Sequence, residues 1–161
     1  ENTGDAEWGQ LAIGQGPLDV TVVGVSRFIQ SIGNNGVMLP PTIEYDLATD
    51  PPNGDRVMSD GTAEMLMDAM RAVVRGGTAQ AAGPIINPTG WSIGGKTGTA
   101  QIAGQADNGW FAGIVFDPEG EPRYSVVSLV MGGGGGGGAP TRIAARVARE
   151  VVDSPPTYEE E

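Results

Sequence analysis

The sequence contains no cysteine and no histidine. Without cysteine there is no disulfide framework, no thiolate nucleophile and no cysteine-ligated zinc, and without histidine there is no imidazole base or imidazole ligand. Most catalytic triads of hydrolases are therefore excluded. The side chains left for chemistry are those of serine, threonine, lysine, tyrosine and the acidic residues.

Positive charge is scarce, and arginine carries nearly all of it. Nine Lys and Arg stand against 20 Asp and Glu, which gives a formal net charge of −11 at pH 7. This balance repels phosphate backbones and anionic lipid, so we expect no nucleic-acid partner. Lys96 is the single lysine. It marks either a place that needs a compact ammonium group or a surface lysine without a role, and composition leaves both open.

The length of the chain suits one domain. A sequence of 161 residues can bury one core of its own. Glycine and proline are frequent, at 27 and 12 residues, but the apolar residues between them are periodic, so a folded domain is predicted. We place this domain at residues 1–153. Residues 154–161 are acidic and rich in proline and are expected to form a disordered tail.

Three segments repeat their apolar residues at helical spacing. The first covers residues 18–32 and runs into the sequence Gly-Asn-Asn-Gly, which supplies left-handed conformations at a helix end. The second follows Ser59, a good N-cap, and stops at the glycine pair 76–77, and the third follows Pro140. Residues 1–16 and 78–90 lack such spacing and are predicted to be loops.

Three further segments are predicted to be strands. Residues 91–102 form the first, and residues 110–116 and 124–131 form a hairpin around the turn Asp-Pro-Glu-Gly. A short edge strand is also expected within residues 37–45. Helices gathered against an antiparallel sheet make an α+β architecture.

The segment from Gly90 to Thr97 satisfies the phosphate-loop pattern G-x-x-x-x-G-K-[ST], and the apolar residues before Asp117 resemble a strand that ends in a magnesium ligand. A phosphate loop needs a strand before the first glycine and a helix that begins near the lysine. Residues 85–89 are short and broken by proline, and residues 97–104 have no helical stripe. Nucleotide binding therefore stays a remote alternative.

On an edge strand, the sequence Lys96-Thr97-Gly98-Thr99 has a different use. Alternation puts Lys96 and Gly98 on one face, with the threonines on the other face or turned toward the strand edge. A glycine gives clearance for a substrate lying against the strand, and threonine hydroxyls can donate to a carboxylate. A backbone N–H on that edge can face a developing oxyanion.

This element resembles the lysine-threonine-glycine motif of the transpeptidase domain of penicillin-binding proteins. The resemblance, to class B-like members, extends from about residue 11 to residue 152 and includes, in order, the motifs at residues 12–16, 73–79 and 108–113. It implies the α+β fold of the serine β-lactamase and penicillin-binding protein group, with this chain forming the C-terminal half of the domain.

The resemblance also implies an activity and a set of site residues. The activity is that of a peptidoglycan D,D-transpeptidase, which cross-links stem peptides ending in D-Ala-D-Ala through a serine acyl-enzyme and reacts with β-lactams, with no metal or organic cofactor. Lys96 would tune the electrostatics of acylation, and the Thr99 backbone N–H would form half of the oxyanion hole. Thr97 and Thr99 would bind the substrate carboxylate, and Gly98 would give clearance. Trp110 would line the cleft, although a hairpin tryptophan is more often part of the core.

The nucleophile of that family, a serine in S-x-x-K, is not found in this sequence. Ser92 precedes Lys96 by four residues instead of three, and neither Ser31 nor Ser59 begins an S-x-N motif. We therefore expect a missing N-terminal half to supply the nucleophile, together with an anchor that holds the domain on the extracytoplasmic face of the bacterial cytoplasmic membrane. This chain alone is expected to be inactive. The alternative is a catalytically inactive homologue that senses β-lactams or serves as a scaffold. Seven consecutive glycines, residues 132–138, leave the end of the last strand in doubt.

Overall fold

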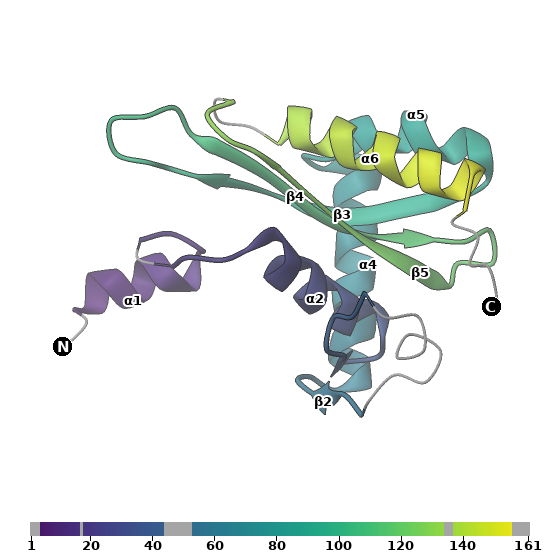
Figure 1. The fold of residues 1–161 in the computed structure, drawn as a ribbon, viewed down its shortest axis with the longest axis horizontal. Helices are drawn as coiled ribbons and strands as arrows, with labels where there is room; N and C mark the ends of the chain where they lie inside the picture. The colour runs from purple at the N-terminus through teal and green to yellow at the C-terminus, as the bar shows by residue number, and fades with distance from the viewer. Residues whose placement is uncertain (1–3, 17, 44–52, 134–136, 156–161) are drawn as a thin grey trace.

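The computed structural model describes residues 4–16, 18–43, 53–133 and 137–155. Its centre is a three-stranded antiparallel sheet in the order β3-β4-β5. Helices cover both faces of this sheet (Figure 1), and the α+β prediction is confirmed. The strands are β3 (Ser92–Ala100), β4 (Asn108–Phe116) and β5 (Pro122–Val130). The longer helices are α2 (Val22–Gly33), α4 (Asp60–Gly76) and α6 (Gly138–Asp153).

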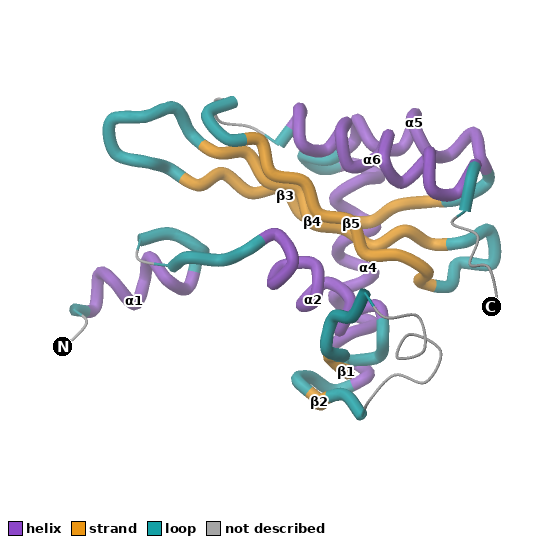
Figure 2. The backbone as a smooth tube through the Cα atoms, viewed as in Figure 1, coloured by secondary structure: helices purple, strands orange, loops and turns teal. Residues whose placement is uncertain are grey.

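The predicted hairpin forms with a defined register. Gly109 pairs with Val130 at one end of the β4–β5 ladder, and Val115 pairs with Tyr124 near the turn. Strand β3 pairs with β4 from Ser92 opposite Phe116 to Ala100 opposite Asn108. The turn between β4 and β5 is closed by Asp117, whose N–H donates to the Glu121 carbonyl at 2.9 Å. The segment that joins β3 to β4 projects beyond the helices, near the N-terminal residues (Figure 2).

Helix α2 begins later than its apolar spacing predicts. The Thr21 hydroxyl accepts a hydrogen bond from Gly24 N–H and caps the helix there. Leu18 lies before this cap and is 45% exposed, whereas Ile29 and Ile32 are buried. The stripe thus extends past the helix, and its part from Val25 onward packs against the sheet.

Helix α4 has the predicted ends. Ser59 is its N-cap, and the Ser59 hydroxyl accepts from Thr62 N–H at 3.2 Å. Gly77 is its C-cap, and the N–H of Gly77 donates to the Val73 carbonyl. The expected edge strand is reduced to β1 (Val37–Met38), which pairs with β2 (Asp55–Arg56). Residues 39–43 of that expectation form no strand, and residues 44 and 45 lie outside the described residues.

Both predicted loops contain helix, so these two predictions are wrong. Residues Asp5–Ala12 form α1, whose Trp8 is 61% exposed. An exposed helix leaves no apolar stripe in the sequence, which is why periodicity missed it. Between α4 and β3 lie three short elements: η1 (Gln80–Ala82), α5 (Gly83–Ile86) and η2 (Asn87–Thr89). The prolines that indicated a loop stand at the first turns of α5 and η2, where proline is tolerated.

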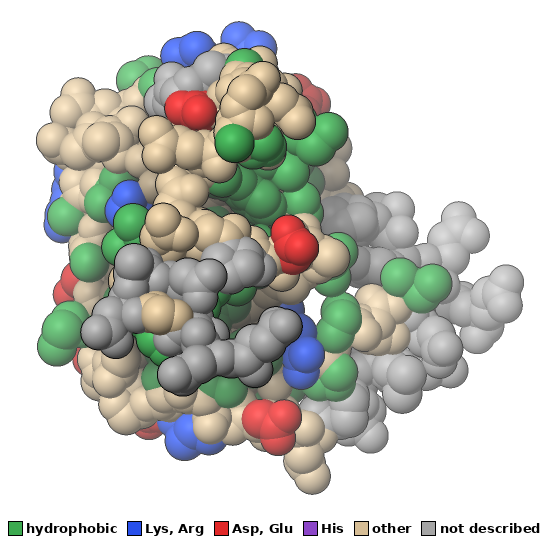
Figure 3. All heavy atoms as spheres, turned by 90° about the vertical axis from the view of Figure 1, so that its left-hand side faces the viewer, with side chains coloured by type: hydrophobic (Ala, Val, Ile, Leu, Met, Phe, Trp, Pro, Cys, Tyr) green, Lys and Arg blue, Asp and Glu red, His purple; other side chains and the backbone are tan. Residues whose placement is uncertain are grey.

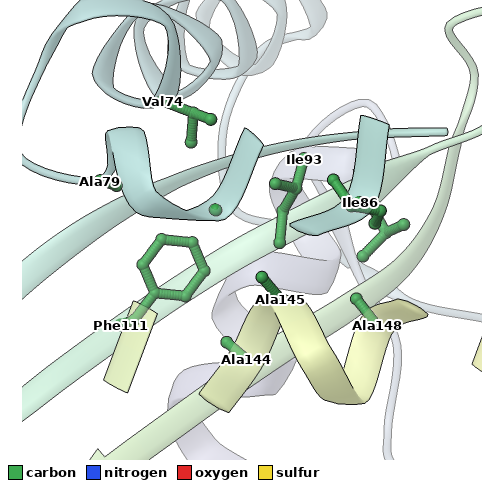
Figure 4. Close-up of a cluster of buried hydrophobic side chains, with 10 residues drawn as sticks. Val74, Ala79, Ile86, Ile93, Phe111, Ala144, Ala145 and Ala148 are labelled. Carbon is green, nitrogen blue, oxygen red and sulfur yellow. The ribbon is translucent and has the colours of Figure 1, made fainter. Parts of the chain in front are cut away.

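Two clusters of buried side chains lie on the two faces of the sheet. On one face, Phe111 and Ile93 pack against the alanines of α6 and against Ile86 (Figure 4). On the other face, Ile29 of α2 and Met70 of α4 pack against Ile114 and Phe116. Alanine on α6 lets that helix lie close to the sheet, so that Phe111 is fully buried.

The C-terminal end of the chain and the distribution of charge on its surface add little to the region of the predicted site residues. Helix α6 ends at Asp153, and residues 156–161 of the expected tail and 134–136 of the glycine run lie outside the described residues. Among the described helices, none is long and apolar enough to cross a membrane. Basic side chains are scattered over the face drawn in Figure 3 and do not gather into one patch.

Candidate active site

Strand β3 forms an edge of the sheet and carries Lys96, Thr97, Gly98 and Thr99, whereas Trp110 lies on the neighbouring strand β4. In an antiparallel strand the N–H and C=O of one residue point to the same side, and successive residues alternate. The Thr99 carbonyl accepts from the Gln15 side chain at 2.9 Å, and the Thr97 carbonyl accepts from Lys96 Nζ at 2.6 Å. Thr97 and Thr99 therefore turn their backbone groups, N–H included, away from β4.

Lys96, Gly98 and Trp110 share one face of the sheet. The register pairs Gly98 with Trp110 and Lys96 with Ala112. A Cβ atom added to Gly98 would lie 3.3 Å from the Cβ of Trp110, so the missing side chain leaves room beside the indole. Lys96 is exposed and Trp110 is half-buried. This face thus presents an ammonium group and a gap along β3, with an aromatic ring beside the gap on β4.

The side chain of Thr97 lies on the opposite face. Thr97 is 8% exposed, and its Oγ1 is 2.7 Å from Oγ1 of Thr78. Its methyl group also fills the space where a Cβ of Gly137 would stand. The structure therefore does not bring the Thr97 hydroxyl together with Lys96, and this hydroxyl would have to leave Thr78 to reach a carboxylate. Thr99 is exposed at the end of the strand.

The glycines before Lys96 serve packing. A Cβ on Gly94 would lie 2.9 Å from the backbone N of Arg71, so α4 crosses β3 there at backbone distance. A Cβ on Gly95 would overlap Cζ and Cε2 of the Phe111 ring on the other face. Both glycines sit inside a strand, and Lys96 stands in its middle instead of opening a helix. The phosphate-loop alternative is therefore wrong.

Asp117, which that alternative treated as a magnesium ligand, is part of the β4–β5 turn. Its carboxylate accepts from Glu121 N–H at 2.8 Å and from Arg123 Nε at 2.6 Å. Burial by itself raises the pKa of Asp117, but the hydrogen bond from Arg123, the backbone N–H donors of Glu121 and Glu119, and the charge of Arg123 together outweigh it and hold the pKa below its usual value. In the described part of the chain, no group of three or more acidic side chains is placed to hold a metal ion.

Sequence reasoning missed Gln15 as a residue next to this edge. Its side-chain amide donates to the Thr99 carbonyl and accepts from Gln101 N–H at 3.3 Å. The signals in the sequence are the motif at residues 12–16, which contains Gln15, and the glycines on either side of Gln15, which indicate a sharply bent backbone.

The sequence matches the family described as "Penicillin binding protein transpeptidase domain" over residues 1–153. It is 37% identical over 145 residues to penicillin-binding protein PbpB of Mycolicibacterium smegmatis. That alignment covers 78% of this chain and 22% of the relative, so the chain spans a small part of the longer protein.

Solved structures agree with this match. Penicillin-binding protein A of Mycobacterium tuberculosis is 25% identical with a TM-score of 0.66, over 92% of this chain and 37% of that chain. The imipenem acyl-enzyme complex of the same protein is 23% identical with a TM-score of 0.65, over 93% and 34% of the two chains. Because the family match spans residues 1–153, the chain belongs to the penicillin-binding protein transpeptidase family.

Proposed function

We propose that this chain is the C-terminal half of the catalytic domain of a peptidoglycan D,D-transpeptidase, and that the outward edge of β3 is its substrate-binding strand. The observation that carries the proposal is the position of Lys96 and of the Thr99 backbone on an edge strand in a member of this family. A buried central strand would have no edge to offer to a peptide.

The reaction in this proposal is acyl transfer through a serine that the preceding half of the domain supplies. The serine oxygen attacks the carbonyl carbon of the penultimate D-alanine, the bond to the nitrogen of the terminal D-alanine breaks, and the hydroxyl proton passes to the departing amine. The amine of a second stem peptide then takes the acyl group and returns a proton to the serine oxygen. A β-lactam enters the first step and forms a stable acyl-enzyme.

In this proposal, each site residue has a role that its position supports. Lys96, exposed on the open face, holds positive charge where the serine proton moves. The Thr99 N–H points to the strand edge and donates to the oxyanion that forms on the carbonyl. Gly98 leaves space for the substrate, and Trp110 lines that space. The exposed Thr99 hydroxyl binds the carboxylate of the substrate. Thr97 would add a second hydroxyl only after rotation away from Thr78.

The partners and the location in this proposal follow from the same chemistry. The ligands are stem peptides ending in D-Ala-D-Ala and β-lactams, the partner segment is the preceding half of the domain, and the enzyme works on the extracytoplasmic face of the bacterial membrane. The imipenem acyl-enzyme described for penicillin-binding protein A supports the β-lactam part of this assignment.

The test is the rate of acylation by a fluorescent penicillin, measured in the protein that carries this chain together with the preceding half of the domain. Lys96→Ala should slow acylation about 100-fold or more, the range for loss of a group that assists proton transfer. Lys96→Arg should stay slow, because a planar guanidinium does not replace a compact ammonium. Arg146→Ala, which removes an exposed charge of α6, is the matched control and should react as the wild type does. A wild-type rate in Lys96→Ala would refute the role of Lys96, and a folded wild type that takes no label would favour the inactive homologue.

A further inference from the structure

The side chain of Gln15 forms two hydrogen bonds with the edge of β3. Its Nε2 donates to the Thr99 carbonyl at 2.9 Å, and its Oε1 accepts from the N–H of Gln101 at 3.3 Å. One amide therefore occupies two backbone positions that a neighbouring strand would use. The contact joins residues 84 positions apart in the sequence, and it lies beside the N–H proposed for the oxyanion hole.

The backbone around Gln15 is built to hold it there. At the end of α1, the N–H of Gly14 donates to the Leu11 carbonyl at 3.0 Å and the N–H of Gln15 donates to the Gln10 carbonyl at 2.8 Å. This pair of bonds is a Schellman motif, which needs a left-handed residue at Gly14, where φ is 75°. Gly16 also has a positive φ, and a Cβ there would lie 2.8 Å from Oε1 of Gln10.

These contacts constrain the two peptide planes that follow Thr99. With the carbonyl of Thr99 and the N–H of Gln101 both held by one rigid amide group, the strand cannot rotate freely at its C-terminal end. The Thr99 N–H, which points to the same side as its carbonyl, is oriented with them.

We propose that Gln15 is a positioning residue of the transpeptidase site: its side-chain amide fixes the outward edge of β3 at Thr99 and thereby aims the Thr99 N–H at the oxyanion. This inference rests on the proposed function. It also sets a boundary for the substrate, because a peptide laid along β3 pairs with the edge as far as Thr99, and beyond that point the amide of Gln15 occupies the edge.

Three variants test the proposal in the protein that carries the whole domain. Gln15→Leu removes both hydrogen bonds and should slow acylation by penicillin about tenfold, as expected when one or two hydrogen bonds no longer support the site. The loss should fall on the acylation step and not on the prior binding of the β-lactam. Gln80→Leu makes the same chemical change at an exposed glutamine that lies beside Ser92 and Ile93, at the opposite end of β3 from Thr99, and should leave acylation unchanged.

The pH profile of Gln15→Glu separates positioning from a merely structural role. An ionised carboxylate still accepts from Gln101 N–H but repels the Thr99 carbonyl, whereas a protonated carboxyl group donates to that carbonyl as the amide does. Its acylation rate relative to wild type should therefore recover as the pH falls toward the ordinary carboxyl pKa of about 4.3. The exchange rate of the Gln101 amide hydrogen, which should rise in Gln15→Leu, gives a readout that does not depend on activity.

The results distinguish this inference from the proposed function. If wild type is acylated, Lys96→Ala is not, and Gln15→Leu reacts at the wild-type rate, the positioning role of Gln15 is refuted while the proposed function stands. A slow Gln15→Leu together with a Gln15→Glu that recovers at low pH supports the role. A Gln15→Glu that stays equally slow relative to wild type at every pH, while folded, contradicts it. A folded wild type that is never acylated overturns both.

Discussion

Replacing Gly94 by alanine should force helix α4 away from β3. The added Cβ would lie 2.9 Å from the backbone N of Arg71, 3.0 Å from the carbonyl carbon of Met70 and 3.3 Å from the Cα of Arg71. These are backbone atoms of a helix, so no side-chain rotation relieves the contact. Overpacking of this kind costs about 1–3 kcal/mol of unfolding free energy. The same shift would displace β3 two residues before Lys96.

The assay is urea unfolding of the purified protein, with Gly61→Ala as the matched control. Gly61 lies in the first turn of α4, and a Cβ there would meet nothing within 4 Å. The same methyl group should therefore stabilise the protein at Gly61, by about 0.5–1 kcal/mol. If Gly94→Ala unfolds at the same urea concentration and with the same slope as wild type, the close approach of α4 to β3 is not as described.

Three further predictions concern stability. The Asp117 carboxyl has a pKa in the folded protein below its ordinary value of 3.8, so its contribution to stability is full above pH 3.8 and is lost as the pH falls through the lower folded pKa. Acid unfolding should show this loss, and Asp117→Asn should lack it. Phe111→Ala empties a fully buried position and should cost about 3–5 kcal/mol in urea unfolding, and a cost below about 1 kcal/mol would contradict the described core. Thr78→Val leaves the buried Thr97 hydroxyl without the partner it has at 2.7 Å and should cost about 1–3 kcal/mol; an unchanged unfolding midpoint would argue against that contact.

Local sequence signals were sufficient for the sheet and for the helices that bury a face. Strands β4 and β5 were predictable from their apolar residues and from the turn at Asp117, and α4 from its cap at Ser59. Helix α1 was not, because its side chains, such as Trp8, stay exposed and leave no period to detect. The short helices before β3 were hidden by proline and glycine, which are compatible with both a loop and the first turn of a helix.

For the candidate site, strand alternation predicted which side chains share a face, but not which distant residues contact them. Alternation correctly placed Lys96 and Gly98 on one face, because that inference needs only neighbours in sequence. The contact of Thr97 with Thr78 spans 19 residues and that of Gln15 with Thr99 spans 84. Contacts of this range depend on how helices dock on the sheet, and a single sequence carries no local signal for them.

The most direct test of the central claim is the mass of the protein after incubation with penicillin, followed by peptide mapping. The protein should be the one that carries this chain together with the preceding half of the domain. We predict that the mass of the protein rises by one β-lactam per molecule, attached to a serine outside residues 1–161. Lys96→Ala should show no such rise within the same incubation time. A folded protein with no gain in mass, or a label attached within residues 1–161, would contradict the account of β3 as the substrate-binding edge of a D,D-transpeptidase.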